Sequence, residues 1–198
     1  IFTHRILYVE DDPGLSLLMQ KNLQRRGYRV DTAANGREGM ALLAQNPYDL
    51  VLLDYNMPFC GGLDVIRMLS DTGTLPPTIM VTADNNVEVA VEALKLGASD
   101  YVIKDAEMKY LDLLPVVIGQ VLERQRLVRE REQVIRAMQE SEARYRTLFD
   151  ESPLPMWVAD VNTERFLAVN GAALRRFGYP AQEFLAMTTK EVFTETGR

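Results

Sequence analysis

Cysteine and histidine are scarce in this 198-residue sequence, which has one of each, Cys60 and His4. A single cysteine excludes an internal disulfide and is typical of a reducing compartment, so we expect a cytoplasmic protein. A single histidine excludes a histidine-rich metal site of the kind that binds zinc.

Long apolar runs and excess positive charge are also lacking. No run approaches the roughly 18 residues of a membrane span, and nothing at the N-terminus resembles a signal peptide. The formal net charge is −6 at pH 7, which argues against a chain that coats nucleic acid or an anionic membrane by bulk electrostatics. No basic recognition helix is visible in the sequence. We therefore predict no nucleic-acid partner and no membrane association.

The first 105 residues contain a regular alternation of short apolar runs with helical patterns. The run that ends at Asp54 has four consecutive apolar residues, as expected of a strand that is buried on both faces of a parallel sheet. Five such runs read as strands, at 5–9, 28–33, 49–54, 78–82 and 101–103. The pattern predicts an α/β domain with a five-stranded parallel sheet between two layers of helices.

Polar side chains stand at the ends of four of these strands: Glu10 and Asp11, then Asp54, Thr82 and Lys104. Because the carboxyl ends of parallel strands meet at one edge of a sheet, we expect these side chains to lie together. Three carboxylates there would repel one another unless a cation lay between them, and oxygen ligands open to water suit Mg²⁺. With a hydroxyl and an ammonium added, the set meets the needs of phosphoryl transfer, with Asp54 as the nucleophile.

Each of these residues also has a simpler interpretation. Asp11 or its neighbour Asp12 could cap the first helix, and Asp54 could cap the helix that follows it. Thr82 could be an ordinary hydroxyl at the start of a helix, and Lys104 a solvated strand end. The position of all of them at the ends of different strands favours a shared site.

Helical character returns near Glu107 and continues to about residue 146, although Pro115 must either kink this helix or restart it. Within it Val121, Val128 and Ile135 repeat every seven residues, with charges of both signs between them. An apolar seam flanked by mixed charge is typical of a coiled coil, so we expect a homodimer through this helix. A single surface helix packed on the first domain is the alternative.

In the last fifty or so residues the pattern changes from a long helix to short strands and short helices. Segments 155–160 and 166–170 read as a β-hairpin, 172–177 as a helix, and short helical pieces follow to residue 198. Two strands do not normally close a core on their own. We therefore expect the front part of a domain whose remainder lies beyond residue 198.

Residues 4–125 resemble the receiver domains of two-component response regulators. The motifs that carry the resemblance are ILYVEDD at 6–12, Asp54 followed by Met57-Pro58 and Gly62, Thr82-Ala83, Tyr101 and Lys104. The resemblance implies a flavodoxin-like, doubly wound fold. It also implies that a sensor histidine kinase or a phosphotransfer protein is the phosphoryl donor.

The resemblance further implies a role for each matched residue. Asp54 is then the phosphoacceptor, Thr82 and Lys104 take part in the catalysis, and Thr82 and Tyr101 form a switch. The implied Mg²⁺ ligands are Asp11, Asp54, the backbone carbonyl of Asn56 and, indirectly, Glu10. One position departs from the family, because Asp105 follows Lys104 where proline is usual. The cis X-Pro bond that is common there is then not expected, and a carboxylate is added beside the lysine.

Residues from about Ser141 resemble the start of a PAS sensory domain, in YRTLF at 145–149, Asp160, Val169-Asn170 and FGY at 177–179. Three parts are therefore predicted. A receiver domain spans 1–125, a coiled-coil-like connector continuous with its last helix spans 126–143, and a partial PAS domain spans 144–198.

These parts predict a response regulator of a bacterial two-component phosphorelay, which relays phosphorylation through the connector to a PAS or output region. No output catalytic domain is recognised, so the expected catalysis is the receiver's own phosphotransfer and dephosphorylation. One alternative is the N-terminal regulatory fragment of a larger signalling enzyme, such as a diguanylate cyclase or a hybrid histidine kinase. Another is a receiver that acts as a docking module without phosphorylation.

Overall fold

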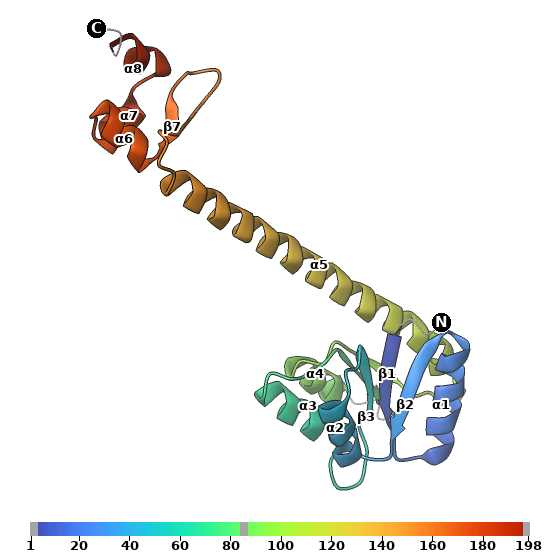
Figure 1. Cartoon of the computed structure of the whole chain (residues 1–198). Coiled ribbons are helices and arrows are strands. Elements are labelled where there is room, and N and C mark those ends of the chain that lie inside the picture. Colours follow the sequence, from blue (N-terminus) through green and yellow to red (C-terminus); the bar gives the residue numbers. More distant parts are fainter. Residues whose placement is uncertain (1–3, 84–86, 196–198) are drawn as a thin grey trace. The chain divides into compact units, whose positions relative to one another are not determined.

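A computed structural model of the chain describes residues 4–83 and 87–195 (Figure 1). Its contacts divide the chain into two compact units, Ile1–Arg129 and Glu130–Arg198. The ends of the predicted receiver and PAS ranges, 1–3 and 196–198, lie outside the described residues.

The first unit is built on a parallel sheet with the strand order β2-β1-β3-β4-β5. This order and the parallel pairing of every neighbour confirm the predicted flavodoxin-like fold. The strands are β1 His4–Val9, β2 Tyr28–Ala33, β3 Leu50–Asp54, β4 Thr78–Thr82 and β5 Asp100–Ile103. β3 and β4 are buried along their whole length, as a run without polar alternation predicts for central strands.

Helices cover both faces of this sheet (Figure 1). The helices are α1 Pro13–Arg25, α2 Gly36–Gln45, α3 Gly62–Asp71, α4 Val87–Lys95 and α5 Tyr110–Asp150. Met19 of α1 and Leu114 of α5 pack with one set of alternating strand residues. Val65 of α3 and Val89 of α4 pack with the other set. The two clusters form separate cores, one on each face of the sheet.

Helix α5 begins at Tyr110, three residues later than the sequence predicts. The reason is Asp105, whose carboxylate accepts the backbone N–H of Lys109 at 3.0 Å and of Tyr110 at 2.7 Å. These bonds satisfy amide groups that have no partner within the first turn of a helix. Pro115 lies inside α5. It does not restart the helix, which is continuous from Tyr110 to Asp150.

The predicted apolar seam of α5 is divided between two environments. Val121 is 1% exposed and belongs to the core around α1 and α5. Every residue from 126 to 148 is exposed, including Val128 and Ile135. The homodimer through this segment stays a prediction.

The second unit contains the end of α5 and a small antiparallel hairpin, as the sequence predicts. The remaining elements are β6 Trp157–Ala159, β7 Phe166–Val169, α6 Gly171–Phe177, α7 Ala181–Ala186 and α8 Thr189–Glu195. Phe166, Phe184 and Val192 form its buried core. Asn170, fully buried at the end of β7, caps α6 by accepting the backbone N–H of Ala173.

Candidate functional site

Strand alternation directs Glu10 to the face of the sheet that α1 and α5 cover. Ile6 and Tyr8 of β1 point into the core on that face, and Glu10, two residues further on, continues the same alternation. The Tyr8 hydroxyl donates a hydrogen bond to Glu10 Oε2. The Glu10 side chain is 2% exposed, so this carboxylate is held inside the edge of the sheet.

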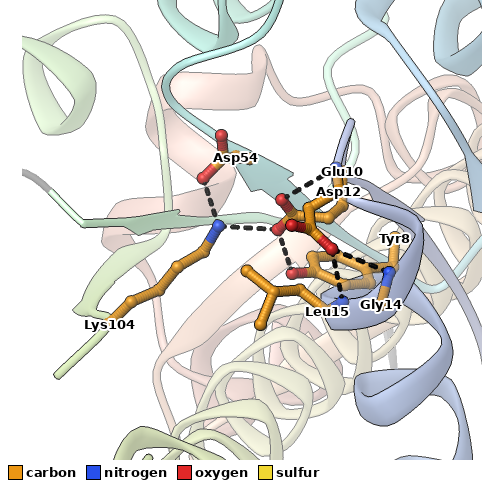
Figure 2. A network of polar contacts seen from close by, with 7 residues as sticks. All are labelled: Tyr8, Glu10, Asp12, Gly14, Leu15, Asp54 and Lys104. Carbon is orange, nitrogen blue, oxygen red and sulfur yellow. Dashed lines mark hydrogen bonds and ion pairs between the residues drawn. The ribbon is translucent and has the colours of Figure 1, made fainter. Parts of the chain in front are cut away.

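Lys104 joins Glu10 to Asp54 across the sheet edge. Its Nζ lies 2.6 Å from Glu10 Oε2 and 2.6 Å from Asp54 Oδ1 (Figure 2). The Lys104 side chain is 9% exposed. Its backbone N–H donates to the Thr82 carbonyl at 2.7 Å, which extends the pairing of β4 and β5 by one bond. The residue after the last strand is therefore anchored to its neighbour, and the simpler interpretation of Lys104 as a solvated strand end is wrong.

Three carboxylates converge at the same edge. Glu10, Asp11 and Asp54 each offer an oxygen atom that lies within 4.8 Å of the others. Glu10 and Asp54 are buried, whereas Asp11 is exposed. Hard oxygen donors at this spacing, with one side open to water, fit the preference of Mg²⁺ for carboxylates and retained waters. The sequence prediction that these carboxylates lie together is met by the geometry.

The pKa values of Asp54 and Lys104 depend on two opposing effects, burial of each group and the ion pair between them. Burial raises the pKa of the Asp54 carboxyl, while the hydrogen bond and charge of Lys104 act in the opposite direction. Burial alone would lower the pKa of Lys104, but its bonds to Asp54 and Glu10 outweigh burial and the pKa is raised. Burial, followed by the charge of Glu10, raises the pKa of the Tyr8 phenol. Tyr8 is therefore a neutral hydrogen-bond donor and Lys104 a cation.

The loop after Asp54 turns sharply against the strand end. The Gly62 N–H donates to the Tyr55 carbonyl at 3.0 Å. A Cβ atom at Gly62 would collide with the Asp54 carbonyl oxygen, so only glycine permits this close approach. Asn56, two residues after β3, is exposed in this loop. The part that its backbone carbonyl plays stays a prediction.

Thr82 and Tyr101 lie on the two strands at one side of the sheet. Thr82 ends β4 and is 2% exposed, one residue beyond Val81, which pairs with Asp54. Tyr101 lies on the edge strand β5 and is 36% exposed. The structure thus places Thr82 at the edge that carries Asp54, and Tyr101 near the start of its strand.

Two aspartates near the site act as helix caps. Asp12 Oδ1 accepts the N–H of Gly14 at 2.7 Å and of Leu15 at 2.9 Å (Figure 2). The capping interpretation is therefore right for Asp12 and wrong for Asp11. Asp105 reaches the start of α5 from five residues before it, and its two carboxylate oxygens accept the N–H groups of Lys109 and Tyr110.

Sequence reasoning missed Tyr8, which reads as one more apolar residue of a strand. The signal that could have found it is the spacing of two between Tyr8 and Glu10, which puts both side chains on one face of β1. A buried tyrosine hydroxyl usually has a hydrogen-bond partner, and Glu10 is the nearest acceptor along that face.

Comparison with known proteins gives two family matches. Residues 6–113 match the response regulator receiver domain, and residues 143–196 match a PAS domain. The transcriptional regulatory protein PcoR of Escherichia coli is 40% identical over 100 residues, which cover 50% of this chain and 44% of PcoR. The uncharacterized transcriptional regulatory protein YkoG of Bacillus subtilis is 40% identical over 106 residues, which cover 54% and 46%.

The chain thus spans about half the length of these curated relatives. Both are named as transcriptional regulatory proteins. These relatives therefore do not support the prediction that the protein has no nucleic-acid partner. Within residues 4–83 and 87–195, no helix combines the length and apolar character that a membrane span requires.

Among solved structures, the response regulator TrrA of Thermotoga maritima, crystallised with Mg²⁺-BeF, is 31% identical. Its TM-score is 0.54, and the match covers 60% of this chain and 99% of TrrA. The match to the family extends over more than half of the chain, and the parallel sheet with its acidic edge agrees with it. The chain belongs to the response regulator receiver family, and its first unit is the receiver domain of a two-component response regulator.

Proposed function

We propose that Asp54 accepts a phosphoryl group from a sensor histidine kinase or a phosphotransfer protein. The observation that carries the proposal is the Lys104 ammonium, buried 2.6 Å from a carboxylate oxygen of Asp54 and 2.6 Å from one of Glu10. In the reaction, a bond forms between an Asp54 oxygen and phosphorus as the bond from phosphorus to the donor breaks. An ammonium fixed beside the attacking oxygen neutralises charge on the phosphoryl oxygens.

The reaction is proposed to require Mg²⁺, held by Asp11, Asp54 and the backbone carbonyl of Asn56, with Glu10 acting indirectly. The donor set supports this, because three carboxylates lie within 4.8 Å of one another and Asp11 is open to solvent. A bound Mg²⁺ would supply positive charge to the phosphoryl oxygens. The relative TrrA, solved with Mg²⁺-BeF, supports the same assignment.

Thr82 and Tyr101 are proposed to convert phosphorylation into a change of shape. The Thr82 hydroxyl, at the end of the strand beside β3, would donate to a phosphoryl oxygen on Asp54. Tyr101, half-exposed on the edge strand, would repack as Thr82 moves. The face formed by α4, β5 and α5 would then change.

We propose that this change travels along α5 to the second unit. Tyr110, Leu114 and Ile118 of α5 are buried in the receiver core, and the same helix continues without interruption to Asp150. The proposed parts are a receiver at 1–125, a connector at 126–143 and a partial PAS domain at 144–198. The single cysteine supports a cytoplasmic location for all three.

The connector is proposed to pair with a second copy of the chain. The large apolar residues of α5 between 126 and 148, which span the connector and the helical turn after it, lie on one side of the helix and are between 46% and 72% exposed. We call them the connector stripe: Leu127, Val128, Val134, Ile135, Met138, Tyr145 and Leu148. Apolar side chains at near-heptad spacing along one face are the feature that pairs helices in coiled coils.

Phosphoacceptance is tested by labelling the full chain with radioactive acetyl phosphate and Mg²⁺. The wild type is expected to take label, and Asp54→Asn is expected to take none, because the attacking oxygen is lost. Asp71→Asn, at the exposed end of α3, is the matched control and should be labelled like the wild type. Chelation of Mg²⁺ should abolish labelling.

Failure of the folded wild type to take label would reject the proposal. It would favour the docking module, a receiver that binds partners without being phosphorylated.

A further inference from the structure

Tyr8 is the part of the site whose chemistry the phosphoacceptor scheme does not use. Its side chain is fully buried among apolar residues of the sheet and of α5, such as Leu52 and Leu114. Its hydroxyl donates a hydrogen bond to Glu10 Oε2 at the border of this apolar core. A phenylalanine would fill the same space, so the hydroxyl is the feature that requires explanation.

The two oxygens of the Glu10 carboxylate have unequal surroundings. Oε2 accepts two hydrogen bonds, from the Tyr8 hydroxyl and from Lys104 Nζ (Figure 2). A carboxylate oxygen has two lone pairs in its plane, so these donors occupy the acceptor capacity of Oε2. Oε1 accepts the Asp12 N–H over a long distance of 3.4 Å.

Glutamate also needs a device to hold its carboxylate in place. The terminal torsion of a glutamate side chain is broad, with no sharply preferred rotamer. Lys104 is shared between Glu10 and Asp54, so it cannot orient Glu10 independently of Asp54. The Tyr8 hydroxyl comes from a rigid central strand and a packed ring.

We infer that Tyr8 is a positioning residue for the cation site. Its hydroxyl holds Oε2 toward the core and Lys104, and so leaves Oε1 to face a water of a divalent cation beside Asp11 and Asp54. The inference rests on the proposed function, which makes this cation the Mg²⁺ required for phosphorylation of Asp54. Hydrogen-bond partners that orient acidic groups around a metal typically contribute about 10-fold or more to its affinity.

The test is calorimetric titration of the full chain with magnesium chloride, for the wild type and Tyr8→Phe. The variant keeps the ring and removes the hydroxyl, and we expect its Mg²⁺ affinity to fall about 10-fold. The Mg²⁺ concentration for half-maximal labelling by acetyl phosphate should rise by the same factor, and the difference in rate should shrink as Mg²⁺ saturates.

Tyr48→Phe is the matched control. The Tyr48 hydroxyl donates to the carboxylate of Asp31 at 3.0 Å, a bond of the same chemistry that lies before β3, at the opposite end of that strand from Asp54. It should leave Mg²⁺ affinity at the wild-type value. In a Glu10→Ala background, Tyr8→Phe should have no further effect on Mg²⁺ affinity, because the carboxylate through which the hydroxyl acts is absent.

Equal Mg²⁺ affinities for the wild type and Tyr8→Phe, with thermal unfolding unchanged, would overturn the inference. So would an equal loss in Tyr48→Phe. A wild type that binds Mg²⁺ but takes no label would reject the proposed function alone, and the calorimetric difference would still decide the role of Tyr8. A wild type that binds no Mg²⁺ would reject both.

Discussion

At the scale of single residues, Asn170 shows how one buried amide can hold a small unit together. Its Oδ1 accepts the N–H of Met156 at 3.0 Å and of Ala173 at 2.8 Å. Its Nδ2 donates to the carbonyls of Phe149 and Leu154, both at 2.9 Å. The amide therefore ties the end of α5, the segment before β6 and the start of α6 to the end of β7.

Asn170→Ala is expected to destabilise the second unit by about 3 kcal/mol, because buried amide and carbonyl groups would lose their partners. The chain has one tryptophan, Trp157, so denaturation followed by its fluorescence reports on this unit alone. Asn162→Ala, at an exposed position in the hairpin loop, should change the free energy of unfolding little. A loss below about 1 kcal/mol for Asn170→Ala would show that water replaces these bonds.

The site residues that could be predicted from the sequence are those whose location depends only on their position at the end of a strand. Asp54 and Lys104 follow apolar runs, and parallel strands bring their ends to one edge. The role of Asp12 as a cap could not be separated from that of Asp11, because adjacent aspartates differ only in the direction of their side chains. Tyr8 was missed because its hydroxyl matters only once Glu10 is placed beside it.

At the scale of elements, the start of α5 depends on the residue that departs from the family. Asp105 accepts two backbone N–H groups at the helix start. Desolvation raises its pKa, but backbone hydrogen bonds and the charge of Lys109 together outweigh it, and the pKa is lowered. A carboxylate at this point also interacts favourably with the helix dipole. Asp105, where the resemblance to receiver domains leads one to expect proline, thus supplies hydrogen-bond acceptors for the start of α5.

Asp105→Ala is expected to lower the midpoint of thermal unfolding of the receiver at neutral pH, because the cap is lost. The Asp105 pKa is lowered from 3.8 in the folded state. The stabilisation by its charge is therefore complete above pH 3.8 and is lost as the pH falls through the lower folded value. The difference between the wild type and Asp105→Ala should accordingly shrink in strong acid.

Asp105→Asn is the control for that experiment, since its carboxamide oxygen can accept one of the two N–H groups but carries no charge. It should keep part of the stability at neutral pH without the acid-dependent component. A pH-independent difference between the wild type and Asp105→Ala would show that the charge plays no part.

The strands of the parallel sheet could be predicted almost to the residue, whereas the start of α5 could not. Strand β2, Tyr28–Ala33, follows Gly27, and strand β4, Thr78–Thr82, follows Pro77, so each start is marked by a residue that interrupts regular structure. Residues 105–109 mix charged side chains with Ala106 and Met108 and show no helical periodicity, so nothing local distinguishes a capped turn from a first helical turn. Pro115 was ambiguous because proline can be accommodated near the start of a helix.

At the scale of the whole molecule, the chain joins a receiver to a second compact unit through a helix of 41 residues. The family match explains the first unit, and the PAS match at 143–196 covers most of the second. The apolar seam of α5 could be predicted from heptad spacing, but the point along it where burial in the receiver ends could not. Val121 is covered and Val128 is exposed because only the first turns of α5 reach the sheet.

The wild type is expected to form dimers in a concentration series measured by light scattering. Ile135→Glu combined with Met138→Glu should raise the dimer dissociation constant at least about a hundredfold, because two apolar side chains would be replaced by like charges at the contact. Gln133→Glu combined with Ala143→Glu adds the same charge on the opposite face of the helix, and should dimerise like the wild type. A monomeric wild type, with and without beryllium fluoride, would refute pairing through the stripe.

Because every residue from 126 to 148 is exposed, the stability of this helical segment should depend on the concentration of the protein. A helical segment without buried contacts owes its stability to whatever partner it acquires, and association of two copies obeys mass action. The helicity of this segment, and the fraction of molecules able to pass a signal along it, should then rise with the amount of protein in the cell. Expression level would become an input to the response alongside phosphorylation.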